Sequence, residues 1–235
     1  GFTMARLVLH PQGKRFTLRA LRIKTAGKAS LLKSALIILL AFLSVVSTAS
    51  FAKTIVVLGD SISAAYNMPE EKGWVNLLQQ TLQANGYPHT VVNTSISGDT
   101  TAGGLARINK ALEQHKPELV LLELGANDGL RGFPPFLIKK NLRELIKRSQ
   151  QSGAQVLLLS MRIPSNYGKR YTDLFYNNYP ELADEMGIPF VPFILEDIAL
   201  AKDMRQADQL PPNEKAQPII AEKIWQYLEP VLGIN

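Results

Sequence analysis

Three short stretches of this sequence hold groups that can stabilise a developing negative charge. Ser61 follows an apolar run and Asp60, Gly98 lies in SISGDT, and Asn127 lies in GANDG. A serine at a helix N-terminus is surrounded by backbone N–H groups that favour negative charge. A glycine lets a backbone N–H approach a ligand closely, and an asparagine amide that donates to an oxyanion can contribute about 3 kcal/mol to catalysis. Together these residue types suit a reaction that passes through an oxyanion.

Each stretch also has an ordinary structural use. Asp60 or Ser61 could cap the helical turn that we expect after the first apolar run. Gly98 starts a Gly-Asp pair of the kind found in turns, and Asn127 starts an Asn-Asp-Gly sequence that is strongly turn-forming. The residue types alone therefore do not distinguish a catalytic role from a structural one, and the positions of the three stretches relative to the predicted strands are needed.

Apolar runs and amphipathic stretches alternate along the chain. Short apolar runs rich in β-branched residues predict buried strands, and apolar residues at helical spacing predict helices that cover them. The predicted strands are 54–59, 90–95, 118–125, 154–161 and 188–193, and the predicted helices are 74–86 (ending at Gly86), 100–115, 136–153, 171–187 and about 216–232. This order predicts one α/β domain with a mostly parallel five-stranded sheet and helices on both faces.

The fold class places the three polar stretches at one edge of the sheet. In open α/β sheets the functional crevice lies beyond the carboxyl ends of the strands. Ser61, Gly98 and Asn127 each follow a predicted strand, so we expect them to meet in that crevice. Three unrelated turn or cap residues would have no reason to gather at the same edge.

Residues 1–52 differ in composition from the rest of the chain. They hold eight Lys or Arg and no Asp or Glu, and the apolar run 34–46 precedes a small-residue stretch that ends at Ala52. This order predicts a secretory signal peptide, cleaved after Ala49 or Ala52, and therefore a periplasmic or secreted protein. The apolar run is shorter than the ~20 residues of a membrane span, so we expect no stable span after cleavage. The alternatives are an uncleaved anchor, or an upstream extension that lengthens the basic stretch.

The charge balance changes when these residues are set aside. The whole chain has 26 basic and 20 acidic residues, a net charge of +6, whereas residues 53–235 keep 18 basic and 20 acidic residues, a net charge of about −2. We therefore expect no nucleic-acid partner. The chain has no cysteine, no metal-ligand spacing and no GxGxxG, P-loop or GxSxG motif, so we expect neither a metal nor another cofactor.

These motifs resemble the blocks of the SGNH hydrolase family, also called GDSL esterases. GDS at Ser61, SISGDT at Gly98 and GANDGLRGF at Asn127 match the first three blocks in the family's order. Three further stretches are similar to the bacterial periplasmic thioesterases, lysophospholipases and arylesterases of this family, namely GGLAR (103–107), NYGKRY (166–171) and NEKAQP (213–218). The resemblance covers about residues 53–235, the expected hydrolase domain. It implies a three-layer α/β/α fold of flavodoxin-like type.

The resemblance also implies a role for each matching residue. Ser61 would be the nucleophile that attacks a carbonyl carbon. Its backbone N–H, the N–H of Gly98 and the amide of Asn127 would form the oxyanion hole. The fourth family block, D-x-x-H, supplies the catalytic acid and base, and the matching stretch here is DQLP. Asp208 therefore stands at the position of the acid, but Pro211 stands where the family has histidine.

No other histidine is expected to take the place of the missing base. His10 lies in the predicted signal peptide, and His89 and His115 precede predicted strands. Residues that enter parallel strands lie at the edge opposite the crevice, about 17–20 Å away for a typical strand. We expect none of the three beside Ser61.

The implied function is that of a serine esterase whose activity is strongly impaired. Such an enzyme would hydrolyse small-molecule substrates with short-to-medium acyl chains (aryl esters, acyl thioesters or lysophospholipids) through an acyl-enzyme on Ser61. The alternative is a secreted pseudoenzyme that binds acyl or lipid ligands without turnover. The loop 129–136, GLRGFPPF, helps to shape the acyl site in the family, and its alternative role is a connection to the next helix.

Overall fold

The computed structural model describes residues 53–206 and 211–233, which contain one parallel sheet of five strands. The strands lie in the order β2, β1, β3, β4, β5, and every neighbouring pair is parallel. Their bounds are β1 Thr54–Gly59, β2 Thr90–Asn93, β3 Leu119–Glu123, β4 Gln155–Leu159 and β5 Phe190–Val191. The predicted signal peptide, which includes His10, and the predicted acid Asp208 lie outside the described residues.

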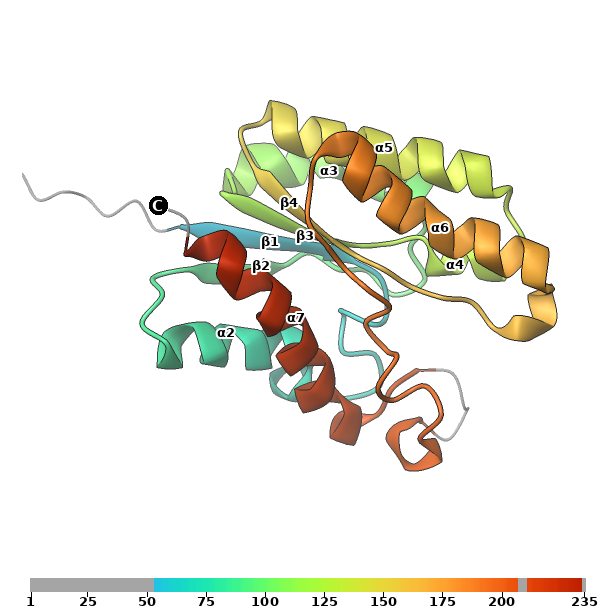
Figure 1. Ribbon diagram of the computed structural model, residues 1–235. Coiled ribbons are helices and arrows are strands. Elements are labelled where there is room, and N and C mark those ends of the chain that lie inside the picture. Colours follow the sequence, from blue (N-terminus) through green and yellow to red (C-terminus); the bar gives the residue numbers. More distant parts are fainter. Residues whose placement is uncertain (1–52, 207–210, 234–235) are drawn as a thin grey trace, which may run out of the picture. The chain divides into compact units, whose positions relative to one another are not determined.

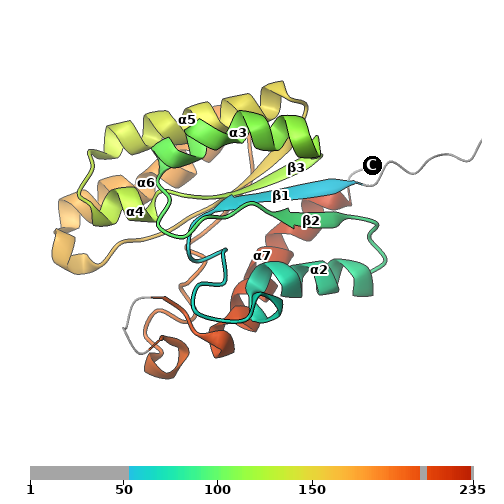
Figure 2. The same cartoon turned by 180° about the vertical axis from the view of Figure 1, so that it is seen from behind.

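Helices cover both faces of this sheet (Figures 1 and 2). Helices α3, α5 and α6 pack side by side on one face, and α2 and α7 pack together on the other. The bounds are α2 Trp74–Ala84, α3 Thr101–His115, α4 Ala126–Leu130, α5 Pro135–Gln151, α6 Lys169–Met186 and α7 Gln217–Leu232, with 3-10 turns η1 Glu70–Lys72, η2 Ser165–Tyr167, η3 Lys202–Met204 and η4 Glu214–Ala216. The predicted three-layer α/β/α architecture is confirmed. Within the described ranges, no helix is both long and apolar enough to cross a membrane.

The two central strands are apolar without alternation because both of their faces are covered. Residues 55–58 of β1 and 119–122 of β3 are each at most 1% exposed. In the register of the sheet Gly59 pairs with Glu123, so β1 and β3 end at the same level. The residues that follow these two strands therefore leave the sheet side by side at its carboxyl edge.

Local sequence sets several helix boundaries. The side chain of Thr100, which precedes α3, accepts a hydrogen bond from the N–H of Gly103 and satisfies a free donor of the first turn. Helix α6 ends at Gly187, whose φ of 64° is the left-handed conformation that glycine adopts most easily. Helix α2 is capped by Asn85, one position before the predicted end at Gly86, and Gly86 follows in a left-handed conformation with a φ of 77°.

Strand β5 is shorter than the predicted strand 188–193. Only Phe190 and Val191 are paired with β4. Pro189 and Pro192 flank this pair, and proline has no N–H to donate to a ladder. Pairing with β4 is therefore limited to the two residues between the prolines, because the prolines have no N–H group to donate.

The helical turn expected after β1 does not continue into a helix. Residues 61–67 form consecutive turns, and the N–H of Ala64 donates to the backbone oxygen of Asp60 at 2.9 Å, which is the hydrogen bond of a single helical turn. Ala65 has a φ of 55°, and such a left-handed residue cannot continue a right-handed helix. Ser61 therefore lies in a turn, whereas Asn127 lies in α4, a helix that the sequence did not predict.

Tyr179 of α6 joins its helix to the loop after β3. Its side chain is fully buried, and its hydroxyl donates a 2.9 Å hydrogen bond to the backbone oxygen of Leu124. Tyr179→Phe leaves that oxygen without this donor, so we expect the free energy of unfolding in urea to fall by about 1–3 kcal/mol. Tyr176→Phe is the matched control, because it keeps the ring that lies 3.7 Å from the guanidinium carbon of Arg162. Equal losses in the two variants would contradict the prediction.

Candidate active site

Asn127 joins the two loops that carry the other predicted site residues. Its side-chain amide donates to Oδ2 of Asp60 (3.2 Å) and to the backbone oxygen of Asp99 (2.9 Å). Asp60 directly precedes Ser61, and Asp99 directly follows Gly98. The structure therefore brings the segments of Ser61, Gly98 and Asn127 together at the carboxyl edge of the sheet. Their roles in catalysis stay predictions.

Arg107 of α3 fixes the ends of β1 and β2 around this cluster. Its guanidinium donates to the backbone oxygens of Gly59 (3.2 Å) and Thr94, and its Nε donates to Oδ2 of Asp99 at 2.7 Å. A guanidinium presents five N–H donors in a fixed plane, so a single side chain can satisfy several acceptors. Arg107 is the last residue of the GGLAR motif, and this contact gives the motif a structural role.

Asp128 holds α4, and with it Asn127, against the start of α3. The Asp128 carboxylate is 2% exposed and accepts hydrogen bonds from the backbone N–H (2.9 Å) and the hydroxyl (2.6 Å) of Thr101, the first residue of α3. The first N–H groups of a helix have no partner within it, and its dipole favours an anion there. Asn141 of α5 donates to the same hydroxyl, so contacts from three helices meet at Thr101.

Ser61 and Gly98 both lie within reach of solvent. Ser61 is half-buried and Gly98 is exposed. Gly98 has a φ of 80°, a backbone conformation in which a side chain would be strained. Within residues 53–206 and 211–233, the backbone N–H of neither residue donates to an acceptor. These are the two backbone donors that the family resemblance assigns to an oxyanion hole.

Two buried carboxyl groups lie next to Ser61. Asp60 is 1% exposed and Glu123 is fully buried. Oε1 of Glu123 accepts hydrogen bonds from the hydroxyl of Ser63 (2.6 Å) and the N–H of Asp60 (3.4 Å). Its Oε2 has no hydrogen-bond partner among the residues that the structure describes. Oδ1 of Asp60 accepts from the N–H of Ile62 at 3.0 Å and its Oδ2 accepts from the Asn127 amide at 3.2 Å, so of the two carboxyls only that of Glu123 has an oxygen without a partner among the described residues.

Burial raises the pKa of both carboxyls because it penalises the charged form. It raises the pKa of Asp60 from 3.8 to about 6 against the lowering effect of the Ile62 N–H, and the charges of Asp99 and Asp128 add to the rise. Burial also raises the pKa of Glu123 well above its usual range, and the neighbouring Asp60 raises it further. The pair therefore retains a proton at a pH at which exposed carboxyls have lost theirs.

The loop that leads to Asp208 and Pro211 is tied to the loop after Ser61. Nε2 of Gln206 donates to the backbone oxygen of Tyr66 at 2.8 Å. The N–H of Gln206 donates to the backbone oxygen of Pro211 at 2.9 Å. Pro211 is thereby held close to the segment that carries the predicted nucleophile, while Asp208 lies outside the described residues.

His89 and His115 lie at the opposite edge of the sheet, as expected. His89 directly precedes β2, and its Nε2 lies 3.1 Å from Oε2 of Glu118, which directly precedes β3. His115 is the last residue of α3. Neither is placed to take a proton from Ser61. Within the described ranges, no three His, Cys, Asp or Glu side chains are arranged to hold a metal ion.

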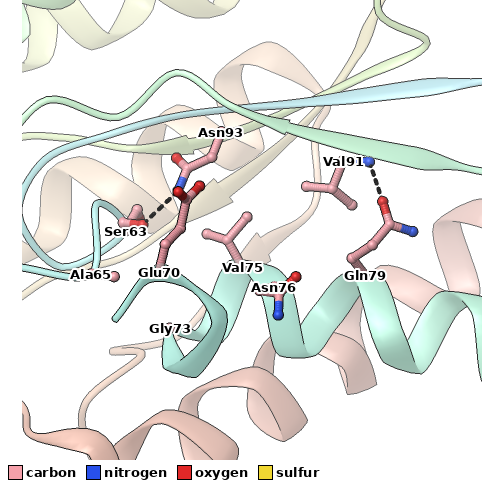
Figure 3. Close-up of a pocket in the computed structure, with 9 residues that line it drawn as sticks. All are labelled: Ser63, Ala65, Glu70, Gly73, Val75, Asn76, Gln79, Val91 and Asn93. Atoms are coloured by element: carbon pink, nitrogen blue, oxygen red, sulfur yellow. Dashed lines mark hydrogen bonds between the residues drawn. The ribbon is translucent and has the colours of Figure 1, made fainter. Parts of the chain in front are cut away.

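A cavity of about 100 Å³ lies beside the cluster, between α2 and the edge strand β2 (Figure 3). Gln79 accepts from the N–H of Val91 at 2.7 Å, and Asn93 donates to the backbone oxygen of Ser63 at 2.8 Å. The lining residues are Ser63, Ala65, Glu70, Gly73, Val75, Asn76, Gln79, Val91 and Asn93. The three predicted site residues that the structure brings together do not line it, so we do not assign it to the candidate active site.

Comparison with known proteins places this cluster in a family. The profile of the GDSL-like Lipase/Acylhydrolase family matches residues 57–217, which include Ser61, Gly98, Asn127 and Pro211. The chain belongs to this family. The predicted resemblance to SGNH hydrolases is thereby confirmed.

Individual relatives of this acylhydrolase agree with the family match. An arylesterase of Vibrio mimicus is 48% identical over 193 residues, which cover 82% of this chain and 96% of that protein. Thioesterase 1/protease 1/lysophospholipase L1 of Escherichia coli (strain K12) is 43% identical over 185 residues, which cover 79% of this chain and 88% of that protein. The crystal structure of TesA matches with a TM-score of 0.75 and 46% identity, over 76% of this chain and 99% of that chain.

Four residues around the cluster were not among the predicted site residues, namely Arg107, Glu123, Asp128 and Gln206. The sequence contains a pattern that could have indicated Glu123, because a charged residue at the end of an apolar strand that is covered on both faces has to be buried with that strand. No local sequence pattern indicates Gln206, because its contact with Tyr66 joins positions that are 140 residues apart. Only the folded chain of this acylhydrolase brings that pair together.

The buried carboxyl pair predicts a loss of stability as the pH rises. Asp60 and Glu123 keep their protons to a higher pH in the folded acylhydrolase than in the unfolded chain. Folding therefore takes up protons above about pH 4, and the free energy of unfolding falls as the pH rises. For Asp60 alone, a pKa raised from 3.8 to about 6 corresponds to a fall of about 3 kcal/mol across that interval.

Urea unfolding between about pH 4 and pH 8 measures this fall. The measurement should use residues 53–235, because they contain the whole sheet. The solved TesA chain, which aligns over 99% of its own length, covers 76% of this chain. Asp60→Asn and Glu123→Gln should each show a smaller fall than the parent. Glu113→Gln, at an exposed position of α3, should keep the full fall. The same fall in all four proteins would show that the buried pair does not cause it.

Proposed function

We propose that this acylhydrolase is a serine esterase of SGNH type that forms its acyl-enzyme on Ser61. Its substrates are short-to-medium acyl esters, among them aryl esters, acyl thioesters and lysophospholipids. The observation that carries the proposal is the pair of hydrogen bonds from Asn127 to Asp60 and Asp99. These bonds bring a side-chain amide to the neighbours of Ser61 and Gly98, as an oxyanion hole requires. The relatives named arylesterase and thioesterase 1/protease 1/lysophospholipase L1 support the substrate class.

In the proposed reaction Oγ of Ser61 forms a bond to the carbonyl carbon of the substrate. The carbonyl π electrons move to the oxygen, which then accepts hydrogen bonds from the N–H groups of Ser61 and Gly98 and from the amide of Asn127. Collapse of this intermediate breaks the bond from the carbonyl carbon to the alcohol or thiol, which takes up the proton that the Ser61 hydroxyl lost when Oγ attacked, and leaves the acyl group on Ser61. Water attacks the acyl-enzyme by the same route and releases the carboxylic acid.

Asn127 has to exchange a hydrogen bond in order to act in this way. Its side-chain nitrogen donates to Asp60 and to Asp99 within the protein. Burial raises the pKa of Asp60 to about 6, and a protonated carboxyl is a weaker acceptor than a carboxylate. An oxyanion competes best for the amide when Asp60 carries its proton.

Pro211 removes the base from this reaction. A serine hydroxyl is a poor nucleophile until a base takes its proton, and the proline ring has no group that can accept one. Asp208 is an alternative base, but a carboxyl with a pKa of about 4 is poorly matched to the task. In another serine hydrolase, loss of the histidine alone costs about 10⁶ in turnover, and about 10³–10⁴ over water survives. We therefore expect strongly impaired hydrolysis.

Restoring a histidine at this position tests the proposal. Pro211→His should raise the hydrolysis of p-nitrophenyl butyrate by residues 53–235 by about 10³-fold or more, because it supplies the general base. Adding Ser61→Ala to that variant should abolish the gain. Pro211→Ala is the matched control, since it removes the ring without supplying a base, and it should gain little. If the parent protein is already as fast as Pro211→His, another group activates Ser61 and the role given to Pro211 is wrong.

Pro211 also favours a second function, that of a pseudoenzyme that binds acyl or lipid ligands without turnover. A p-nitrophenyl phosphonate distinguishes the two, because it labels an activated serine covalently. As an esterase, the parent protein should be labelled slowly at Ser61, and Pro211→His should be labelled much faster, as measured by mass spectrometry. No labelling of either protein, together with saturable binding of a fatty acid, would support the pseudoenzyme instead.

A further inference from the structure

Several large apolar side chains remain exposed after β3 and β4. Five of them, which we call the apolar rim, are 37–70% exposed: Leu130, Phe133, Phe136, Leu137 and Leu174. Phe136 is the most exposed of the five, at 70%. Exposure of apolar area to water is unfavourable, so a cluster of such side chains marks an interaction surface.

The rim residues on α6 and on the segment after β3 belong to one surface. Tyr171 of α6 donates to the backbone oxygen of Phe133 (2.6 Å), and Asn178 of the same helix donates to that of Pro135 (3.0 Å). Leu174 follows Tyr171 by three residues and precedes Asn178 by four, and residues at these spacings share a helix face. Leu174 therefore lies along the segment that holds the other four rim residues.

The apolar rim adjoins the candidate active site. Arg131 lies between Leu130 and Phe133 in the sequence, and its guanidinium donates to the backbone oxygen of Gly98 at 3.4 Å. Leu130 is the last residue of α4, the helix that carries Asn127. A surface that binds the rim would therefore lie next to the proposed oxyanion hole.

Cationic residues accompany the rim, and acidic residues are scarce there. Residues 130–140 and 162–174 together hold six Lys or Arg and one acid, Asp173, although residues 53–235 hold 18 Lys or Arg and 20 Asp or Glu. That one acid pairs with Lys169. A third of the domain's cations is thus concentrated around an apolar surface, in a domain whose net charge is negative.

The cations are not all neutralised by acids elsewhere in the fold. Lys139 pairs with Glu181 of α6 at 2.6 Å. Within the described part of the chain, Lys140 and Arg170 form no ion pair. Both are exposed, so they can meet an external anion.

We propose that the apolar rim docks this chain on an anionic lipid surface. The Phe and Leu side chains would enter the acyl region, and the Lys and Arg side chains would contact lipid phosphate groups. Apolar insertion and cationic attraction are each weak alone, and their combination gives reversible binding to anionic membranes. Docking would deliver lipid esters to Ser61. That consequence rests on the proposed function, whereas the docking itself does not.

Vesicle sedimentation of residues 53–235 tests the docking. The probes are vesicles of phosphatidylcholine alone and vesicles that also contain phosphatidylserine. Because this part of the chain has a net charge of about −2, its overall charge opposes binding to anionic vesicles, and only a local surface can produce it. We expect binding to the anionic vesicles that weakens with salt, and binding to phosphatidylcholine that is at least about tenfold weaker.

Substitutions test whether the apolar rim is the surface that binds the vesicles. Phe136→Ser should weaken binding to anionic vesicles about tenfold, because it removes the most exposed aromatic ring. Lys140→Ala and Arg170→Ala should each weaken it about fivefold. The matched controls are Tyr227→Ser on α7 and Lys110→Ala on α3, both exposed and outside the rim, and they should bind like the parent. Far-UV circular dichroism checks that each variant is folded.

The outcomes distinguish lipid docking from a role of the rim in the substrate site. A parent protein that does not bind anionic vesicles, or controls that lose as much binding as the rim variants, would overturn the proposal. Leu137→Ser with Leu174→Ser should weaken vesicle binding but leave hydrolysis of p-nitrophenyl acetate by the Pro211→His protein unchanged. The reverse result would assign the rim to the substrate site and overturn the docking. An inactive Pro211→His protein would contradict the proposed function alone, because vesicle binding needs no turnover.

Discussion

The arrangement of the candidate site depends on one guanidinium, that of Arg107. The backbone oxygen of Gly59, the last residue of β1, accepts from the N–H of Ile96 at 3.0 Å, whereas that of Thr94, which follows β2, depends on a side-chain donor. An unpaired buried acceptor costs about 1–3 kcal/mol. Arg107 reaches from α3 to the oxygens of Gly59 and Thr94 and to the carboxylate of Asp99. This side chain adds to the backbone hydrogen bonds that the N–H groups of Thr94 and Ile96 donate to Val57 and Gly59, and together they hold the two strand ends side by side. The loop of Gly98 takes its position from the same contact.

Four acids surround a site that is proposed to stabilise an oxyanion, and the fold reduces their charge by three different means. Asp99 is paired with Arg107. Asp128 is bound at the N-terminus of α3, where the helix dipole favours an anion. Asp60 and Glu123 are buried, and their raised pKa values let the pair hold a proton instead of two charges. These arrangements reduce the negative field that would otherwise oppose a developing oxyanion.

The sequence predicts the long elements well because their apolar periodicity is uninterrupted. All five strands and five covering helices appear in the predicted order. The differences are short and depend on single residues. Two prolines limit β5, the left-handed Ala65 ends the helical turn after β1, and α4 forms from a sequence typical of turns. The first two differences are local, whereas for α4 tertiary contacts outweigh local preference, because the N–H and hydroxyl of Thr101 donate to Asp128.

The candidate site could be located from the sequence, but its supporting contacts could not. Ser61, Gly98 and Asn127 fall at one edge because parallel strands direct all their carboxyl ends there. Arg107 and Gln206 act across long sequence separations, and no local pattern distinguishes them from other polar residues of a helix or loop. The family resemblance was needed to notice Pro211, because a proline in a loop is ordinary without a motif that expects histidine.

The absence of a base at position 211 need not disturb the rest of the site. Asn127, Arg107 and Asp128 are fixed by contacts among the strand ends, α3 and α4. None of these hydrogen bonds involves the described residues of the loop 205–212, whose side-chain contact with the Ser61 loop is made by Gln206. The segments of the predicted oxyanion donors are held by contacts with the strand ends, α3 and α4, whereas the predicted base would lie on a separate loop. A change at one loop residue can therefore remove proton transfer while the oxyanion cluster keeps its geometry. Under the proposed function, a single side chain, and not the fold, decides whether this scaffold turns over an ester or only binds it.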